Sequence, residues 1–357
     1  MAPCYTETGY NMFDMLSMLQ KSIRRRDYLH AGFAANQLKN RYRRAMWNRL
    51  MVISSEDCYG VITKEITSLF CCDANNANDI NISRAVALLC AARKSRDACY
   101  FACNFVLASR KPREIPVSES EADEFEKRVG VPKESEIQLS LFCEVPTARE
   151  ETRNAVILQK ALDHLDMDMI GYQMDLLRHS DRELLWNVFE DYCNTNVKEV
   201  SEEIHQLRVA DGIVNSRKKE PDEIFISKAA MVLCTAKHRK DLPITGISFI
   251  SPGELIDWKK VAMLPIGECK PDDGIPDWVY DCHTLKGKKM GKTDWDMTTT
   301  EQAALTPLQP CFFDDASWLY TYEQDLENGA ISKAQMQPIW DFAKDHSANP
   351  VEVIPYE

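Results

Sequence analysis

The chain has 357 residues, of which 45% are hydrophobic and 27% charged, and its formal net charge at pH 7 is −12. This length allows two or three domains with their own cores, and no apolar run is long enough to span a bilayer. The N-terminus has no basic stretch followed by an apolar one, so we expect no signal peptide. The 13 cysteines are scattered and odd in number, which favours reduced thiols in a cytoplasmic protein.

Apolar residues at helical spacing predict a series of amphipathic helices in the first 112 residues. The expected helices cover residues 11–25, 27–39, 41–54, 61–72, 84–93 and 96–109. Ser83 and Ser95 are expected to cap the last two of them. Residues 1–114 carry a charge balance of +7, whereas the remainder carries −19. A basic first third on an acidic body suits contact with nucleic acid or with an acidic partner.

Four predicted domains follow one another along the chain. They are a basic helical repeat (1–112), an acidic linker with a short helix (113–150), an acidic helical repeat (151–257), and an irregular basic-loop segment with a C-terminal helix near 331–345 (258–357). Ser118 and Glu121 offer a capping box for the linker helix. We therefore predict an all-α protein with two tandem pseudo-repeated helical domains, an irregular Pro/Gly-rich segment and a C-terminal helix.

The repeat is visible as two blocks of identity. Residues 19–50 match residues 158–189 at an offset of 139, with 9 identities in 32 positions, and residues 82–97 match 226–241 at an offset of 144, with 7 identities in 16. Chance would give roughly 3 identities in these 48 positions, so we interpret the pattern as a tandem duplication of a helical unit. Residues kept in both copies are expected to be scaffold, and residues present in one copy are candidates for function. Trp47 and Trp186 should occupy equivalent pockets.

A basic cluster in the first repeat is the main candidate site. Cations that alternate along the chain with the aromatic residues Tyr28, Tyr42 and Trp47 are suited to contacting phosphates and stacking on bases. Residues 24–26 align with Asp-His-Leu in the second repeat, so we expect that the fold does not require their charges. The alternative is a solvated helix face whose cations favour the helix C-terminus. The candidate residues are Lys21, Arg24, Arg25, Arg26, Arg41, Arg43, Arg44 and Arg49.

A second candidate is the glycine- and lysine-rich stretch at residues 286–293, which ends in Gly-Lys-Thr. A P-loop needs four residues between its first glycine and that tripeptide, and Gly287 leaves three. We therefore expect a basic loop that contacts phosphate, or an arm that packs on a neighbour, and not ATP hydrolysis. Its candidate phosphate-binding residues are Lys286, Lys288, Lys289 and Lys292.

The sequence shows no specific pattern of metal ligands or catalytic residues. The chain has no Cys-x-x-Cys and no converging set of four zinc ligands, so its cysteines are expected to be small buried hydrophobes. No nucleophile–histidine–acid pattern stands out, and we assign no catalytic residue, metal or cofactor. The remaining candidate is a polar site at Asp281 and His283, with Lys94 and Ser95. Glu56 and Asp57 are adjacent and are expected to cap a helix or pair with an arginine of the 41–54 helix.

Residues 49–60 (Arg-Leu-Met-Val-Ile-Ser-Ser-Glu-Asp-Cys-Tyr-Gly) follow a pair of predicted helices. They are similar to the Arg-Leu … Ala-Ser-Glu-Asp-x-Gly element in the C-terminal helical region of the RarA/MgsA family, clamp-loader-related AAA+ ATPases that act at stalled replication forks. Residues 89–95 (Leu-Cys-Ala-Ala-Arg-Lys-Ser) resemble its Leu-Ala-x-Ala-Pro-Lys-Ser element, and residues 281–291 are weakly similar to its terminal stretch. The family's ATPase module is absent, Cys58-Tyr59-Gly60 has one residue too many, Arg93 replaces a proline, and the helical unit occurs twice.

The resemblance implies the oligomerising, DNA-proximal collar of a replication-fork ATPase used without its motor, as in a stand-alone phage or mobile-element protein. We therefore expect a non-catalytic replication or repair accessory protein that forms homo-oligomers. It would bind single-stranded or forked DNA, or replication proteins, through the basic face. The alternatives are a protein-interaction or inhibitor module whose acidic half mimics DNA, and an enzyme of an unrecognised nucleotide-related class. No membrane association is expected.

Overall fold

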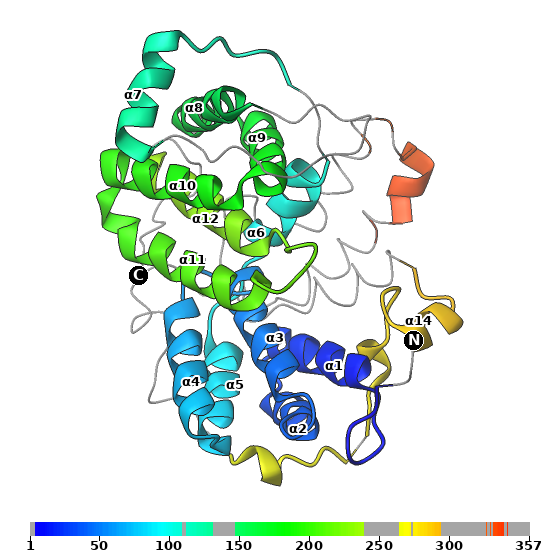
Figure 1. Cartoon of the computed structure of the whole chain (residues 1–357). Helices are drawn as coiled ribbons and strands as arrows, with labels where there is room; N and C mark the ends of the chain where they lie inside the picture. Colours follow the sequence, from blue (N-terminus) through cyan, green and yellow to red (C-terminus); the bar gives the residue numbers. More distant parts are fainter. Residues whose placement is uncertain are drawn as a thin grey trace, which may run out of the picture. The chain divides into compact units, whose positions relative to one another are not determined.

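The computed structural model describes residues 4–108, 112–130, 147–238, 264–272, 274–293, 326, 329, 331–338 and 341. These residues are largely helical and contain no β-strand, which confirms the predicted all-α class. The chain divides into two compact units: unit 1 comprises residues 1–100 and 250–357, and unit 2 comprises residues 101–249 (Figure 1). The expectation of four consecutive domains differs from this division, because the last segment belongs to the same unit as the first helices.

Unit 1 is built on five helices. They are α1 (Met12–Arg24), α2 (Tyr28–Leu38), α3 (Arg43–Glu56), α4 (Thr63–Asn75) and α5 (Asp79–Ala91). Helix α1 packs on α2, α3 and α5, with Met18, Leu19 and Ile23 fully buried. Helix α5 begins earlier than predicted, and its cap is Asn78 and not Ser83: the Asn78 side chain accepts from the backbone N–H of Ile80.

The chain then passes from one unit to the other through a short helix. Helix α6 (Asp97–Phe101) continues into the π-helix η1 (Ala102–Val106), where one long α-helix was expected. Ser95 accepts a hydrogen bond from the backbone N–H of Asp97, as its predicted capping role requires. The predicted capping box at Ser118 and Glu121 is also confirmed, at the start of α7 (Glu119–Val129).

Unit 2 contains a second series of five helices with a short 3-10 turn, η2 (Lys198–Val200). The helices are α8 (Ala148–His164), α9 (Met167–Ser180), α10 (Arg182–Asn196), α11 (Ser201–Asn215) and α12 (Ile224–Lys237). As in unit 1, the first two helices pack together and so do the last two. Helix α7 packs on α8 and α10.

The two units share an unusual turn between their first and second helices. Arg26 and Leu165 stand 139 positions apart, and they alone among the described non-glycine residues have a positive φ, of 60° and 55°. Each precedes an aspartate, Asp27 or Asp166, whose side chain caps the next helix. A left-handed residue that is not glycine is uncommon, so its recurrence at aligned positions is a specific local match.

The last described segments are short. They are the 3-10 turns η3 (Ile266–Glu268) and η4 (Asp277–Val279) and the helix α14 (Leu285–Lys289). Turn η3 packs on α2 and α5, and η4 packs on α1; both lie in the gold-coloured part of Figure 1. Within the predicted C-terminal helix, residues 333–338 are helical, and the rest of the predicted range lies largely outside the described residues. The extended piece considered near residues 247–250 lies wholly outside them.

Candidate nucleic-acid interface

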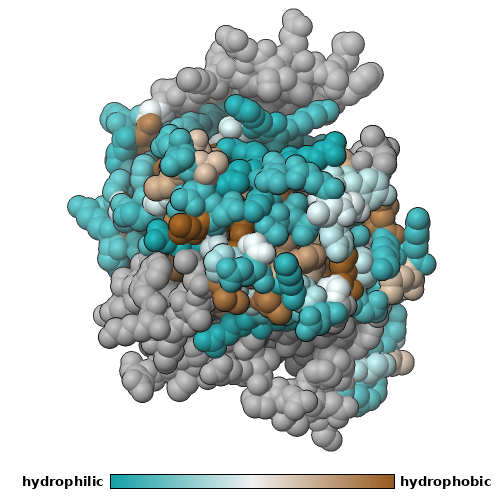
Figure 2. Space-filling view, turned by 90° about the horizontal axis from the view of Figure 1, so that it is seen from below, coloured by the Kyte–Doolittle hydropathy of each residue, from teal (hydrophilic) through white to brown (hydrophobic). Residues whose placement is uncertain are grey.

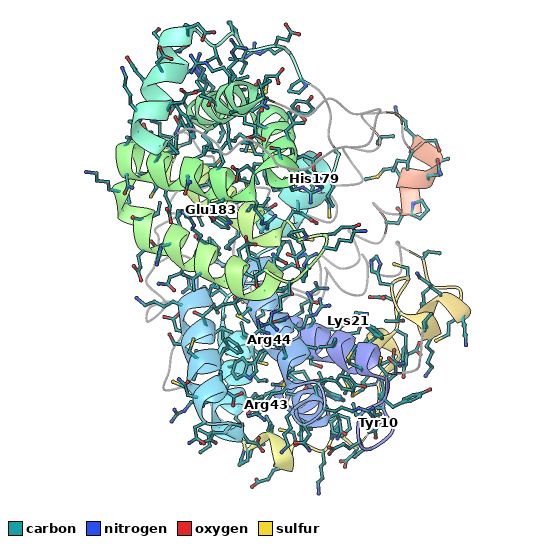
Figure 3. All side chains as sticks on the ribbon, in the orientation of Figure 1. Tyr10, Lys21, Arg43, Arg44, His179 and Glu183 are labelled. Atoms are coloured by element: carbon teal, nitrogen blue, oxygen red, sulfur yellow. The ribbon has the colours of Figure 1, made fainter. Side chains whose placement is uncertain are left out.

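Lys21 is buried and does not belong to a solvated face. Its ammonium group donates to the carbonyls of Trp278 and Val279, both at 3.0 Å, and lies 2.7 Å from Oδ2 of Asp281. Burial raises the pKa of Asp281, but the hydrogen bond and charge of Lys21 outweigh it, so the pKa lies below its usual value. Lys21 therefore anchors the segment around η4 to α1 (Figure 3).

Arg24 is also committed to the fold, through a buried ionic cluster. Its Nε atom lies 3.0 Å from Oδ1 of Asp57, and its Nη2 atom lies 3.2 Å from Oε1 of Glu56. Arg96 binds the same two carboxylates, and Gln20 donates to both. Burial would raise the pKa of Asp57, but the charges of Arg24 and Arg96 keep it below its usual value. A paired carboxylate that is fully buried needs its cations, so Arg24 is structural.

The expectation that the fold does not require Arg24 is wrong for a physical reason. Unit 2 lacks the arginine at the position 139 residues later, and at the same offset it has Thr195 and Asn196 in place of Glu56 and Asp57. The whole ionic cluster is absent there and not just one of its charges. The two carboxylates also pair with α1 and with Arg96, and not with an arginine of α3 as we predicted. Arg49 of α3 donates to Gln20 Oε1 at 2.8 Å, beside the cluster.

Arg43 forms a motif that both units contain. Its guanidinium binds the Asp73 carboxylate through two hydrogen bonds, of 2.7 and 2.5 Å, and Trp47 Nε1 donates to the same carboxylate at 2.7 Å. In unit 2, the same bonds join Asp211 to its arginine (2.9 and 2.6 Å) and tryptophan (2.8 Å), which are Arg182 and Trp186. Arg43 was a candidate nucleic-acid contact, but this recurrence identifies it as scaffold.

The remaining arginines of the cluster are more open. Arg26, Arg41 and Arg44 are exposed, and Arg25 is half-buried. The Arg25 guanidinium lies 4.2 Å from the centroid of the Trp278 ring, and that of Arg44 lies 4.9 Å from the centroid of Phe70. A cation held over an aromatic face is positioned by its attraction to the ring. Figure 3 shows the neighbouring Arg43 and Arg44 at the start of α3.

The basic loop forms helix α14 and is not a phosphate-wrapping loop. Thr284 caps the helix by accepting from the backbone N–H of Gly287, and a Cβ atom on that glycine would clash with the backbone of Asp281. Lys286 lies 3.8 Å from the centroid of the Tyr280 ring, and Lys292 lies 3.6 Å from Asp277. Lys288 and Lys289 are exposed. The loop therefore presents cations from a short, anchored helix.

One group of exposed cations and aromatic residues gathers at the N-terminal end of α1. Arg41 donates to the carbonyl of Tyr5, which forms a β-bridge with Asn11, the residue that caps α1. Lys286 acts on Asp14 in the first turn of α1: burial raises the pKa of Asp14, and the lysine charge opposes this. These contacts link Arg41 and Lys286 to the N-terminal end of α1, which also carries Phe13. We name the exposed residues at this end of α1, together with the exposed lysines of α14, the basic end surface. It comprises Tyr5, Phe13, Arg41, Lys286, Lys288 and Lys289.

The aromatic members of this surface are unusually open. Tyr5 is 46% exposed and Phe13 is 48% exposed, and near Lys286, Leu285 is 71% exposed. Figure 2 shows hydrophobic residues in small groups among hydrophilic ones on the face that it views. On such a surface the cations can neutralise phosphates, and the exposed aromatic rings can stack on bases. Sequence reasoning missed Tyr5 and Phe13, because a helix-period pattern does not show which aromatic residues stay outside the core.

The predicted polar site divides into separate structural roles. Lys94 is fully buried and donates to the carbonyls of Leu89 and Ala92, at 2.5 and 2.7 Å, which closes the end of α5. Burial lowers the pKa of this lysine. Ser95 caps α6, and Asp281 accepts from Lys21 and from the backbone N–H of His283. The described residues hold no group of three or more side chains suited to a metal ion.

Comparisons with known proteins add no relative. No protein-family model matches the chain, and no curated protein or solved structure matches it. Within the described residues, no helix has the length and apolar character needed to cross a membrane.

Proposed function

We propose that the protein binds nucleic acid through the basic end surface of unit 1, as an accessory protein without catalytic activity. The observation that supports this most is the division among the cations. Lys21, Arg24 and Arg43 are used by the fold, whereas Arg41, Lys288 and Lys289 are exposed, as are Tyr5 and Phe13. Cations that stay open to solvent are the groups that can release counterions from a phosphate backbone.

A role in replication or repair is part of the proposal, and it rests on the resemblance of residues 49–60 and 89–95 to the RarA/MgsA helical region. The same resemblance supports a homo-oligomer, which light scattering tests. The free cysteines in the described residues agree with a reducing, cytoplasmic environment. The partner at the basic end surface is nucleic acid in this proposal, and a replication protein is the competing outcome of the test.

The test is a fluorescence polarisation series with single-stranded, duplex and forked DNA at two salt concentrations. Replacing Lys288 and Lys289 with glutamate should weaken binding to all three and lower the salt dependence by about 1 for each phosphate that the variant no longer neutralises. The matched control reverses two exposed cations of unit 2, Arg217 and Lys219, and should leave binding unchanged. Equal binding by the Lys288/Lys289 variant and the native protein would refute the assignment. Capture of a protein partner that depends on the same lysines, without DNA binding, would favour the competing outcome.

A further inference from the structure

A segment outside the helical repeat lies across unit 1. We name residues 264–272 and 274–281 the C-terminal strap. Tyr28 of α2 donates to the Leu264 carbonyl at 2.5 Å, and the backbone N–H of Ile266 donates to Ser83 of α5 at 3.2 Å. Gly32 of α2 faces Cys269 so closely that a Cβ atom at this glycine would clash with the thiol. Farther along, the strap reaches α1, where Lys21 binds it.

A second segment lies across unit 2 in the same manner. We name residues 101–108 and 112–121 the middle strap. It packs on α9 and α12 through η1, and a Cβ atom on Gly171 of α9 would clash with the backbone of Phe105. The strap then reaches α8, where Lys160 donates to the Pro116 carbonyl at 2.9 Å and lies 2.8 Å from Oε1 of Glu121.

The two straps use equivalent anchoring positions. Gly32 and Gly171 stand 139 residues apart, and so do Lys21 and Lys160. Both straps run from the second and last helices of a unit to its first helix. Each strap comes from one set of helices and packs on the other. The middle strap follows helices α1–α5 in the chain but belongs to unit 2. The C-terminal strap follows helices α8–α12 in the chain but belongs to unit 1.

We propose that the strap-receiving face of each unit is an interaction surface between two separable half chains. The halves are residues 1–130 and residues 147–357, and each gives one strap and receives one. The two halves can dissociate only when both straps have come off the units on which they pack. The two contacts therefore strengthen each other, as in bivalent binding. The halves therefore stay bound to one another when the connection through residues 131–146 is cut, as in a dimer that exchanges segments.

The test begins with the full-length protein carrying a protease site within residues 131–146. The folded protein is cut, diluted in steps and followed by size-exclusion chromatography with light scattering. The expected result is co-elution of both halves at the mass of the intact chain. Separation of the halves in native buffer, with each half alone in its own peak, would overturn the proposal.

Variants then show whether the straps hold the halves together. Gly32→Leu and Gly171→Leu each block one strap, and each should raise the dissociation constant of the cut protein about tenfold or more. The double variant should separate on cutting. Gly212→Leu is the matched control, since a Cβ atom there meets nothing within 4 Å. A double variant that stays together as tightly as the native protein contradicts the proposal.

A milder pair of changes covers the case in which the glycine variants lose helical structure before cutting. Lys21→Gln and Lys160→Gln remove the ion pairs at the far ends of the straps and leave the close approaches at the glycines intact. The two changes together should raise the dissociation constant of the cut protein by about tenfold. An unchanged dissociation constant contradicts the assignment.

Discussion

The indole nitrogen of Trp47 donates to the carboxylate of Asp73 at 2.7 Å, across the packing of α3 on α4. The Arg43 guanidinium donates two hydrogen bonds to the same carboxylate, so a single aspartate positions two side chains of α3. The corresponding bond in unit 2, between Trp186 and Asp211, has a length of 2.8 Å. A buried aromatic ring whose N–H group finds a partner is both a packing element and a geometric constraint.

Replacing Asp73 with alanine should lower the free energy of unfolding by about 3 kcal/mol, because it leaves a partly buried guanidinium and an indole N–H without their acceptor. Chemical denaturation with a fluorescence readout measures this, since Trp47 reports on the site. Asp79→Ala is the control: this carboxylate is half-exposed and pairs with Lys39 near the surface. The control should change stability by about 0.5 kcal/mol or less. Equal losses in both variants would contradict a special role for Asp73.

The melting temperature of the protein should fall at acid pH. Asp57, Asp73 and Asp281 all have pKa values below the usual value, since their cations and hydrogen-bond donors outweigh burial. A depressed pKa contributes stability that is fully present above the unfolded-state value, about 3.9, and is lost as the pH falls through the folded-state value. Melting temperature should therefore fall steeply below about pH 4. The variant Asp57→Asn should be less stable at neutral pH, and its melting temperature should fall less steeply with decreasing pH. An unchanged pH dependence would contradict this explanation.

Lys21→Gln should loosen the strap end without unfolding the bundle. The buried ammonium group is the link between α1 and the carbonyls of residues 278 and 279. Hydrogen exchange should become faster in residues 276–281 and stay the same in residues 112–121. Lys160→Gln is the matched control and should give the opposite pattern. Faster exchange throughout unit 1 would show that Lys21 supports the whole fold and not just the strap.

Phe13→Ala should weaken binding to single-stranded DNA by roughly tenfold, because one stacking contact is worth about 1–3 kcal/mol. The salt dependence should not change, since no charge is removed. Leu107→Ala is a suitable control, as Leu107 is exposed to the same extent, 48%, but lies in unit 2. Polarisation with a labelled oligonucleotide at several salt concentrations measures both quantities. A weaker salt dependence in the Phe13 variant would mean that the ring positions a cation and does not stack.

Most helix boundaries could be predicted because they depend on local features. The apolar spacing of α1, the aspartate caps of α2 and α9 and the capping box of α7 act within a few residues of one another. The π-helix at residues 102–106 could not be predicted in this way. It lies where the chain passes into unit 2 and packs on α9, so contacts distant in sequence decide its form.

The sequence contains part of the information on which the candidate site depends. The sequence shows which residues are cationic, and Arg41, Lys288 and Lys289 are indeed exposed. It does not show which cations have a buried carboxylate as their partner. Asp57 lies 33 positions from Arg24, and Asp281 lies 260 positions from Lys21, so neither pairing leaves a local pattern.

The sequence by itself determined the all-α class, the cap at Ser95 and the capping box at Ser118 and Glu121, because hydrophobic period and capping are short-range effects. Only the tertiary structure decided which strap covers which unit and which cations remain open to a partner. These outcomes depend on desolvation and ion pairing between segments far apart in the chain, and both arise only when the folded backbone brings those segments together.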